Sequence, residues 1–222
     1  MKKILLITTG GTIASIQTNN GLKPQLDGNV LLNFIPEIKE FCEVDVRGLL
    51  SIDSTNIYYK HWLLIAKTIK ENYENYDGFV ICHGTDTMSY TASALSYLIQ
   101  NSKKPIVLTG AQKPINLDVS DAKTNLKDSF IYACSSHASG VVIIFNGNVI
   151  LGTRARKIRS KSFDAFASID YPKVAIVQDN HVIPYITNLS NDTIFFSLLL
   201  IASRAALMAL TAPIAFRSIQ GI

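Results

Sequence analysis

The stretch YDGFVICHGTDTMSYTASALSYLI, residues 76–99, contains a strand, a turn and a helix in direct succession. Its apolar run GFVIC, residues 78–82, is too short for a helix and contains the residue types that suit a buried strand. The polar turn HGTDT follows at once. Beyond it, apolar side chains recur with helical period at four positions: Ala94, Leu95, Leu98 and Ile99. This order of elements is the repeating unit of an α/β fold.

The same unit recurs on both sides of this stretch. Three more short apolar runs predict strands: residues 4–7, 105–110 and 140–145. Two segments with helical period predict helices: residues 60–73 and 118–134, the second with Ser120 as a candidate N-cap. Alternating strands and helices predict an open α/β domain with a parallel sheet, in which ligands bind beyond the carboxyl ends of the strands. The turns TTGGT, residues 8–12, and HGTDT, residues 83–87, lie there.

Length and composition set the class of protein. The 222 residues suffice for one large domain, or one domain plus a fragment, and 48% of them are hydrophobic, which predicts a real core. The net charge of +4 is too mild to indicate a nucleic-acid partner. The cysteines 42, 82 and 134 are far apart without a CxxC pair, which argues against a zinc site or a disulfide framework. The apolar run at residues 4–7 is too short for a signal peptide, so we expect a cytoplasmic protein.

The end of the chain differs in composition from the rest. Residues 194–216, IFFSLLLIASRAALMALTAPIAF, carry one charge, at Arg204. The length fits a membrane span, but an arginine near the middle costs roughly 2.5–3.5 kcal/mol on insertion, and Pro213 lies within the segment. We expect a tail unrelated to the preceding fold, arising by truncation or a change of reading frame. A buried helix and a membrane segment are the alternatives.

The first turn, TTGGTIA, supplies hydroxyls at a strand end. Gly10 and Gly11 let the backbone turn sharply and approach a ligand closely. The dinucleotide pattern GxGxxG and the phosphate-loop pattern GK[ST] are both absent from it. One interpretation is a glycine turn whose threonines cap the next helix. The other is that Thr12 is a nucleophile, which requires an adjacent base because a threonine hydroxyl is weak at neutral pH.

The second turn, HGTDTM, places a hydroxyl beside a carboxylate at Thr85 and Asp86. Either residue could cap the following helix, although capping alone does not require both. His83 suggests a triad, but no GxSxG elbow is present, and a histidine against a buried strand is more often structural.

A lysine with a lowered pKa is another candidate base. The segment GTRARKIRSK contains five cations, at Arg154, Arg156, Lys157, Arg159 and Lys161. Most of these are expected to form a solvated basic face. A nucleic-acid patch is a weaker interpretation, because no aromatic residue lies between the charges. Asp53 and Ser54, in the polar turn SIDST, could cap a helix or hold a small polar substrate, and TGAQKP, from Thr109, is a loop of the same kind.

In this order, the motifs TTGGTIAS, SIDSTN, YDGFVICHGTDTMSYTASALSY, KKPIVLTGAQKPI and KIRSKSFDAFASIDYP resemble the bacterial asparaginase/glutaminase family, and most closely its cytoplasmic type I L-asparaginases. TGGTIA and HGTDTM are the family's two signatures, here about 70 residues apart. The resemblance extends to about residue 193. It implies a Rossmann-like open, mostly parallel sheet flanked by helices, with an N-terminal catalytic domain over residues 1–190. Residues 191–222 are then an apolar tail, a truncated or divergent remnant of the linker and C-terminal domain.

The resemblance also implies roles for single residues. Thr12 corresponds to the nucleophile that attacks the side-chain amide carbon of L-asparagine, forms an acyl-enzyme and releases ammonia. Thr85, Asp86 and Lys157 correspond to a second catalytic group, in which Lys157 activates the Thr85 hydroxyl or a water. Asp86 would orient Lys157 or bind the substrate amine.

Substrate binding is implied at further positions. Asp53 and Ser54 match the loop that binds the substrate's α-carboxylate and amine, together with Thr85 and Asp86. Backbone amides near Thr12 and Ala111 would stabilise the oxyanion, a contribution of several kcal/mol when they are aligned in advance. The resemblance implies no metal and no organic cofactor.

Two departures from the family pattern are visible. The loop after the first signature reads GLKP, with Leu22 where many members carry a tyrosine, so no tyrosine partner is assigned to Thr12. The second, smaller α/β domain of the family is also missing, although in the family a neighbouring subunit's C-terminal domain completes the site. A homodimer or homotetramer is expected if that domain is present, and neither nucleic acid nor membrane is an expected partner.

Three functions follow as hypotheses. The first is an L-asparaginase, with mixed glutaminase activity as a variant. The second is a truncated, inactive chain that misfolds or binds a small amino acid such as aspartate. The third is the amidase subunit of a tRNA-dependent amidotransferase, which carries the same signatures. It is disfavoured because those subunits have an extra N-terminal domain and the first signature begins here at Thr8.

Overall fold

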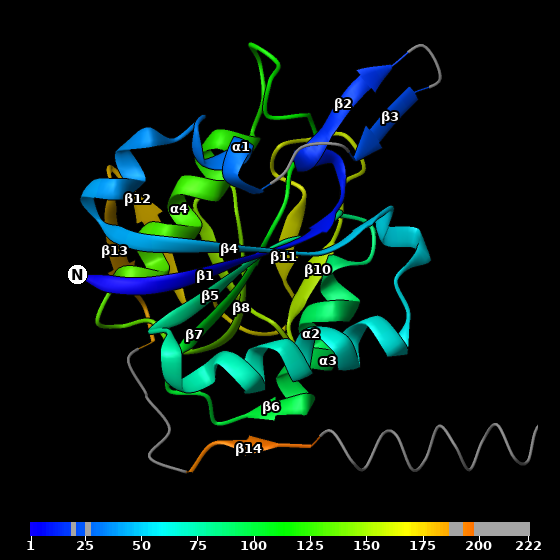
Figure 1. Ribbon diagram of the computed structural model, residues 1–222. Coiled ribbons are helices and arrows are strands. Elements are labelled where there is room, and N and C mark those ends of the chain that lie inside the picture. Colours follow the sequence, from blue (N-terminus) through cyan, green and yellow to red (C-terminus); the bar gives the residue numbers. More distant parts are fainter. Residues whose placement is uncertain (19–20, 25–27, 187–192, 198–222) are drawn as a thin grey trace, which may run out of the picture.

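An eight-stranded sheet forms the centre of the molecule. The structure, a computed structural model, describes residues 1–18, 21–24, 28–186 and 193–197. The strand order is β13-β12-β9-β8-β7-β5-β1-β4, in which the last five run parallel and the first three antiparallel (Figure 1). The strands are β1 (Lys2–Gly10), β4 (Cys42–Ile52), β5 (Gly78–Cys82), β7 (Pro105–Thr109), β8 (Gly140–Phe145), β9 (Asn148–Leu151), β12 (Ala175–Gln178) and β13 (His181–Pro184). The predicted open, mostly parallel α/β fold is confirmed.

The parallel strands form where continuous apolar runs are buried on both faces. Every residue of β5 and β7 is buried, and residues 4–10 of β1 are buried as well. The four strands predicted from apolar runs, β1, β5, β7 and β8, are all present. Burial on both faces removes the alternation that an exposed strand shows, which is why uninterrupted apolar runs identified them.

Helices cover both faces of the sheet. The α-helices are α1 (Gly28–Leu32), α2 (Tyr59–Asn72), α3 (Met88–Leu98) and α4 (Ala122–Cys134). α2 and α3 lie on one face, and α1 and α4 on the other (Figure 1). Short 3₁₀ helices follow several strands or helices: η1 (Thr12–Ala14), η2 (Pro36–Glu40), η3 (Ser54–Asn56) and η4 (Tyr73–Asn75). The helices predicted at 60–73 and 118–134 correspond to α2 and α4, and the helix predicted after the turn HGTDT corresponds to α3.

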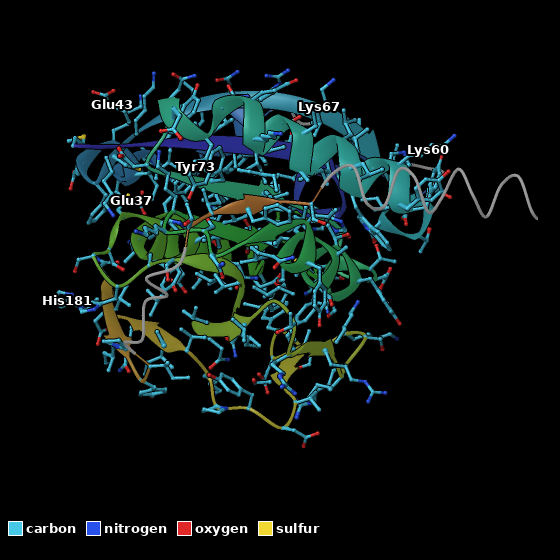
Figure 2. The ribbon with its side chains drawn as sticks, turned by 90° about the horizontal axis from the view of Figure 1, so that it is seen from below. Glu37, Glu43, Lys60, Lys67, Tyr73 and His181 are labelled. Carbon is cyan, nitrogen blue, oxygen red and sulfur yellow. The ribbon has the colours of Figure 1, made fainter. Side chains whose placement is uncertain are left out.

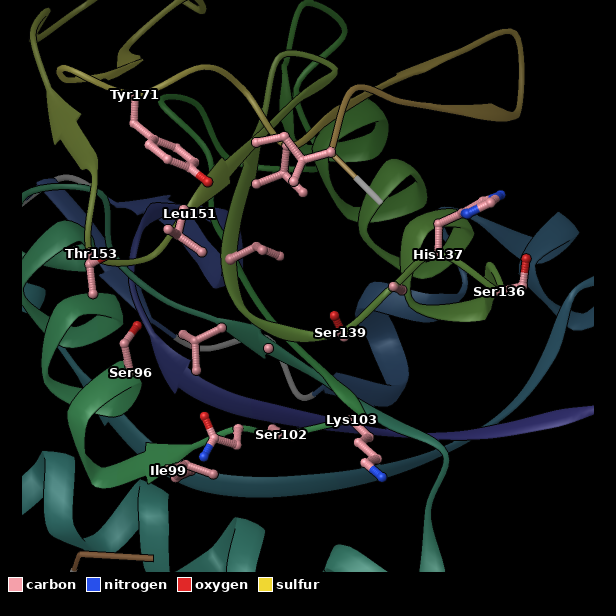
Figure 3. A pocket seen from close by; sticks show the side chains of 17 residues that line it. Ser96, Ile99, Ser102, Lys103, Ser136, His137, Ser139, Leu151, Thr153 and Tyr171 are labelled. Carbon is pink, nitrogen blue, oxygen red and sulfur yellow. The ribbon is translucent and has the colours of Figure 1, made fainter. Parts of the chain in front are cut away.

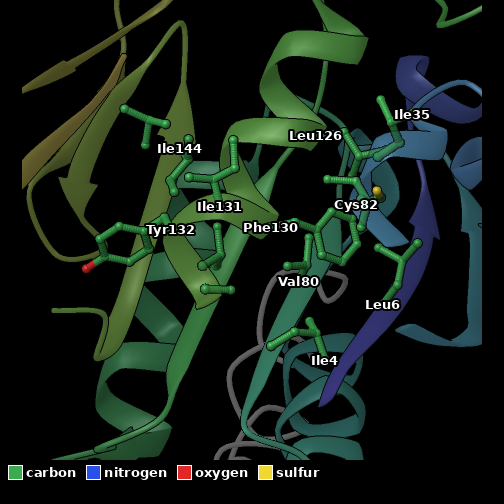
Figure 4. Packing of buried hydrophobic residues seen from close by; sticks show 14 of the residues in the cluster. Ile4, Leu6, Ile35, Val80, Cys82, Leu126, Phe130, Ile131, Tyr132 and Ile144 are labelled. Carbon is green, nitrogen blue, oxygen red and sulfur yellow. The ribbon is translucent and has the colours of Figure 1, made fainter. Parts of the chain in front are cut away.

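α4 packs into the larger of two hydrophobic clusters. Figure 4 shows Leu126 and Phe130 of α4 beside Val80 of β5, and all three side chains are fully buried. The expected N-cap at Ser120 is wrong by one residue, since Asp121 takes that position. Ser120 instead accepts a hydrogen bond from the Ala122 amide at 3.1 Å, and the Asp121 carboxylate faces the loop after β7.

The other strands of the described residues form short antiparallel pairs. β8 and β9 are joined by Asn146 and Gly147, both with positive φ, as a tight type I′ hairpin requires. β12 and β13 are joined in the same way by Asp179 and Asn180. The remaining pairs are β2 (Ser15–Thr18) with β3 (Gly21–Pro24), β10 (Ala155–Lys157) with β11 (Phe166–Ser168), and β6 (Ile99–Gln100) with β14 (Phe195–Phe196).

β14 lies along the outside of the face that carries α2. Phe196 packs edge-on against Tyr73, with ring centroids 5.7 Å apart, while Lys60 and Lys67 project away from α2 into solvent (Figure 2). Residues 198–222, which hold most of the apolar tail, lie outside the described part, so the expectations for the tail stay predictions. Within the described residues, no helix is both long and apolar enough to cross a membrane.

Candidate functional site

Three glycines bring the ends of neighbouring strands into direct contact. At Gly11, with φ of +81°, a side-chain Cβ would lie 2.5 Å from the Gly84 Cα. At Gly84 it would lie 2.6 Å from the Cβ of Ser54, and at Gly110 it would overlap the His83 carbonyl oxygen. Only glycine permits these approaches. The strand ends of β1, β5 and β7 therefore meet, and the residues that follow each glycine gather at one edge of the sheet.

Thr12 is the accessible hydroxyl of the first turn. Thr8 and Thr9 are buried, and the Thr9 hydroxyl donates to the Cys82 carbonyl at 2.9 Å. Thr12 is half-buried and begins η1, whose N-cap is Gly11 and lacks a side-chain cap. The interpretation that threonines cap the next helix is therefore wrong. Thr12 follows Gly11 as Thr85 follows Gly84, so the two threonines stand on adjacent strand ends.

Lys157 joins Thr85 and Asp86. Its ammonium donates to Thr85 Oγ1 at 2.8 Å and to Asp86 Oδ1 at 2.7 Å. The lysine side chain is 15% exposed and that of Asp86 59% exposed, so the pair lies at the mouth of the site. Neither Thr85 nor Asp86 caps α3. The N-cap is Thr87, whose hydroxyl donates to the Ser54 carbonyl at 2.6 Å. From the sequence alone, Thr85 and Asp86 could have been either helix caps or catalytic residues. In the structure, both contact Lys157 and neither caps the helix.

The remaining cations of the basic segment behave as a solvated face. Arg154, Arg156, Arg159 and Lys161 are all exposed, whereas Lys157 is half-buried. Arg159 pairs with Asp164 at 2.5 Å, and the Arg154 guanidinium lies 5.7 Å from the centre of the Tyr171 ring. The strand pairing of β10 with β11 turns Lys157 inward, opposite Phe166.

Gln112 is a site residue that sequence analysis did not identify. The Thr85 hydroxyl donates to its Oε1 at 3.3 Å, and its Nε2 donates to the Ser162 carbonyl at 3.1 Å. Its backbone amide donates to the Asp121 carboxylate at 2.9 Å. Gln112 therefore connects Thr85 to the segment that follows Lys157. The sequence feature that could have identified Gln112 is its position in the polar loop TGAQKP.

His83 is structural. Its Nδ1 donates to the Gly84 carbonyl at 2.7 Å, and its Nε2 accepts from the Thr91 hydroxyl at 2.8 Å, which in turn accepts from Trp62 Nε1. With Nδ1 as the donor, this arrangement suits a neutral ring whose Nε2 accepts. Burial lowers the pKa of His83 to about 4. Both ring nitrogens are engaged and the side chain is fully buried, so His83 is not placed as a base.

The predicted substrate loop lies against the same glycines. Asp53 caps η3, accepting from the Thr55 amide at 2.8 Å and from its hydroxyl at 2.7 Å. The Thr55 hydroxyl bond, followed by the amide bond, lowers the pKa of the Asp53 carboxyl. Ser54 is buried against Gly84, and Ala111 is buried after Gly110. Asp53 thus has the capping role, which leaves its other oxygen for further contacts.

Two pockets flank α3. One of about 580 Å³ opens beside the site and is lined by Asp86 and Lys157, together with Ser89, Tyr90 and Arg156. Another of about 540 Å³, shown in Figure 3, is lined by Ser102, His137 and Tyr171 among others. Residues 101–103 and 136–139 of its lining directly precede β7 and β8, so it lies toward the opposite edge of the sheet from Thr12 and Thr85. Throughout the described ranges, no group of three or more His, Cys, Asp or Glu side chains is arranged to hold a metal.

Comparison with known proteins places this fold and site in context. Residues 3–189 match the family model described as Asparaginase, N-terminal. The L-asparaginase of Thermococcus kodakarensis is 40% identical over 182 residues, 82% of this chain and 55% of that protein. A solved structure of the thermostable L-asparaginase from the same organism superimposes with a TM-score of 0.83 at 37% identity, covering 88% of this chain and 60% of the other.

Two further relatives carry different names. L-asparaginase 1 of Escherichia coli K12 is 37% identical over 178 residues, 77% of this chain and 52% of that protein. A glutamyl-tRNA(Gln) amidotransferase subunit of Methanococcus vannielii is 37% identical over 185 residues, 79% of this chain and 43% of that protein. The chain therefore spans about half the length of the curated relatives it matches.

Proposed function

The chain belongs to the asparaginase family through its N-terminal domain, and on that premise we propose that it is an L-asparagine amidohydrolase, converting L-asparagine to L-aspartate and ammonia. The observation that carries the proposal is the contact of Lys157 with both Thr85 and Asp86. The contact joins a strand of the β10–β11 pair to the turn after β5, more than 70 residues earlier in the chain. Capping does not explain Thr85 and Asp86, because the N-cap of α3 is Thr87 and makes no side-chain cap bond. Asparaginase-family relatives at 37–40% identity support the same reaction class.

The proposed reaction has two halves. In the first, the Thr12 hydroxyl attacks the side-chain amide carbon, and its proton passes to the departing nitrogen, which leaves as ammonia. Backbone N–H groups that follow Gly11 and Gly110 face the developing oxyanion. In the second half, water attacks the acyl-enzyme and restores the Thr12 hydroxyl. Thr85, held between Lys157 and Gln112, positions that water, whose proton passes to Thr12 Oγ1 as the acyl bond breaks.

The substrate's charged end is proposed to lie toward Asp53, Ser54 and Asp86. The Asp53 carboxylate is kept ionised by its Thr55 bonds, which suits an α-ammonium group. Asparagine and glutamine differ by one methylene, which a pocket distinguishes by only about 1–3 kcal/mol, so mixed glutaminase activity is the variant to measure. We place the protein in the cytoplasm.

A second candidate follows from the Methanococcus vannielii relative, named as an amidotransferase subunit, whose identity equals that of the Escherichia coli protein. In that case the same site would release ammonia for a partner protein. The two functions differ in whether free L-asparagine is turned over in the absence of a partner.

The experiment is an ammonia assay on the 222-residue chain with L-asparagine and L-glutamine. Thr12→Ala should lower turnover about 10³-fold or more, and Lys157→Met about 10²–10⁴-fold. Thr124→Ala and Lys60→Met, which alter an exposed threonine on α4 and an exposed lysine on α2, are the matched controls and should retain full activity. Full turnover by Thr12→Ala would exclude Thr12 as the nucleophile.

If the assay detects no ammonia, the alternative to test is a chain that binds an amino acid without turning it over. A chain that binds without turnover should give a calorimetric signal with L-aspartate that Asp53→Ala removes. A folded chain that gives neither ammonia nor binding would contradict the proposed function.

A further inference from the structure

Two buried polar side chains at the start of α4 hold the loop that follows β7. Asp121, 7% exposed, is the N-cap residue of α4, and Asn125, 1% exposed, lies one turn later. Their side chains bind the loop of residues 110–113. We propose that Asp121 and Asn125 are positioning residues of the reaction, which fix this loop so that Gln112 holds Thr85 in place. The inference rests on the proposed function, because it concerns the step in which Thr85 positions water.

The Asp121 carboxylate does not cap α4, although the residue stands at the N-cap. Its side chain makes no cap hydrogen bond, and the Ser120 hydroxyl accepts from the Ala122 amide instead. The two carboxylate oxygens accept from backbone amides of an earlier segment, from Gln112 at 2.9 and 3.1 Å and from Lys113 at 3.1 Å. A carboxylate that binds two successive N–H groups fixes the path of the backbone between them. The buried carboxylate therefore holds the loop and not the helix.

Asn125 ties the same loop to two other parts of the chain. Its Nδ2 donates to the Gly110 carbonyl at 3.0 Å and to Asp121 Oδ2 at 3.2 Å. Its Oδ1 accepts from the Asn146 amide at 2.8 Å, in the turn between β8 and β9. Both donors and the acceptor of this side-chain amide are thus used inside the protein. Asn125 anchors the loop at Gly110 directly, and at residues 112–113 through Asp121.

The far end of this network is the side chain of Gln112. Its Oε1 accepts from the Thr85 hydroxyl at 3.3 Å, and its Nε2 donates to the Ser162 carbonyl at 3.1 Å. Because this side chain extends from the backbone that Asp121 holds, a shift of that backbone displaces both contacts. Thr85 would then keep only its contact with Lys157, at 2.8 Å. A displacement of about 1 Å in a reacting constellation lowers a rate by about 10²-fold.

The two halves of the proposed reaction give this role a kinetic signature. Thr85 acts in the second half, so its displacement lowers kcat and spares kcat/KM, which reports the steps up to the acyl-enzyme. Asp121→Asn keeps the side-chain volume but places an NH₂ group opposite backbone N–H donors. We expect it to lower kcat about 10–10²-fold and KM in proportion. A loss of folded protein alone would lower kcat and kcat/KM equally.

The test measures ammonia release by Asp121→Asn, Gln112→Ala and the double variant of the 222-residue chain. Gln112→Ala should show the same split, and the double variant should be at most about twofold slower than the slower single variant, because both act through one contact. Intact-protein mass spectrometry after a rapid quench should show the acyl-enzyme accumulating in all three. Asp118→Asn, the same substitution at an exposed residue between β7 and α4, is the control and should keep wild-type kcat. If circular dichroism shows that Asp121→Asn does not fold, Asn125→Ser replaces it.

A second readout does not depend on turnover. The Gln112 side-chain amide is bonded to Ser162, so its two N–H signals in a heteronuclear amide spectrum should differ from those of solvent-exposed glutamines. Their loss in Gln112→Ala assigns them. They should move to the exposed position in Asp121→Asn and stay unchanged in Asp118→Asn.

Three outcomes overturn the inference. One is a folded Asp121→Asn with wild-type kcat or unchanged Gln112 signals. Another is an equal fall of kcat and kcat/KM, and the third is a double variant whose loss is the product of the two single losses. If the wild type releases no ammonia, the proposed function fails, and the Gln112 signals alone decide whether Asp121 positions that side chain.

Discussion

At the scale of single residues, Lys157 makes contacts that contribute little to stability. An ion pair with a partner as exposed as Asp86, at 59%, is worth about 0–1 kcal/mol. Lys157→Met should therefore leave the free energy of unfolding, measured by urea denaturation, within about 1 kcal/mol of the wild type while turnover falls. A loss of turnover without a loss of stability is expected if Lys157 acts in the reaction and does not stabilise the fold.

His83 predicts a pH dependence of stability. Its pKa is lowered to about 4 in the folded chain by burial, from an ordinary value near 6.5. The neutral ring is favoured by folding, so its contribution is complete above pH 6.5 and is lost as the pH falls toward 4. The loss is about 3 kcal/mol. Urea unfolding of wild type and His83→Gln across this range should show a steeper decline in the wild type. Parallel curves would contradict it.

For Asp128 we expect a pH dependence of stability opposite in sign to that of His83. Burial raises the pKa of its carboxyl to about 6, from 3.8. The folded chain therefore disfavours the ionised form, and the cost is complete above pH 6 and vanishes below about pH 4. Asp128→Asn should raise the free energy of unfolding at pH 7 by about 3 kcal/mol and leave it unchanged at about pH 3.5. Chemical denaturation at both values measures this, and an equal gain at both would exclude the ionisation as its cause.

At the scale of elements, the contact between Gly11 and Gly84 sets how closely the turns after β1 and β5 approach. Gly11→Ala combines a positive φ of 81° with a Cβ 2.5 Å from the Gly84 Cα, and should cost about 2–4 kcal/mol. Gly140→Ala is the matched control, because its φ is +66° but nothing lies within 4 Å of the added Cβ. It should cost about 1 kcal/mol. Urea midpoints compare the two, and equal losses would mean that the close approach is energetically unimportant.

The strands that sequence reasoning identified most clearly are those whose burial is complete. β5 and β7 are buried at every residue, so their apolar runs were unambiguous. β10 and β13 alternate between partly buried and exposed residues over only three or four positions, too few to establish a period. The β12–β13 hairpin had a usable signal in its turn, Asp179 and Asn180, both residue types that tolerate positive φ.

The site was predictable in composition but not in geometry. The hydroxyl and carboxylate pair at Thr85 and Asp86 was visible because both follow a buried strand. Which of five cations would turn inward depended on the pairing of β10 with β11, a tertiary contact that no local pattern encodes. Gln112 was missed for the same reason, since its contacts to Thr85 and Ser162 come from other parts of the chain.

At the scale of the whole molecule, the chain covers 52–55% of the two L-asparaginases it matches. We propose that the remaining half of such a protein closes the site over Thr12 and Asp86. Joining residues 1–186 to the C-terminal half of the Thermococcus kodakarensis enzyme should raise ammonia release per chain about 10²-fold, the size expected when reacting groups gain correct geometry. Thr12→Ala in the same fusion is the control. If the original chain releases ammonia, a fusion no faster than it would show that this half is sufficient alone.

The sheet order also governs how the chain folds during synthesis. β1 lies inside the sheet, between β4 and β5, so Ile4 pairs with Gly78. Its second edge stays open until residue 82 has been synthesised, roughly 4–16 s after residue 1 at ordinary elongation rates. During that interval an apolar strand is unpaired and prone to aggregate. The yield of folded protein should therefore depend on chaperones that bind the first 80 or so residues of the nascent chain.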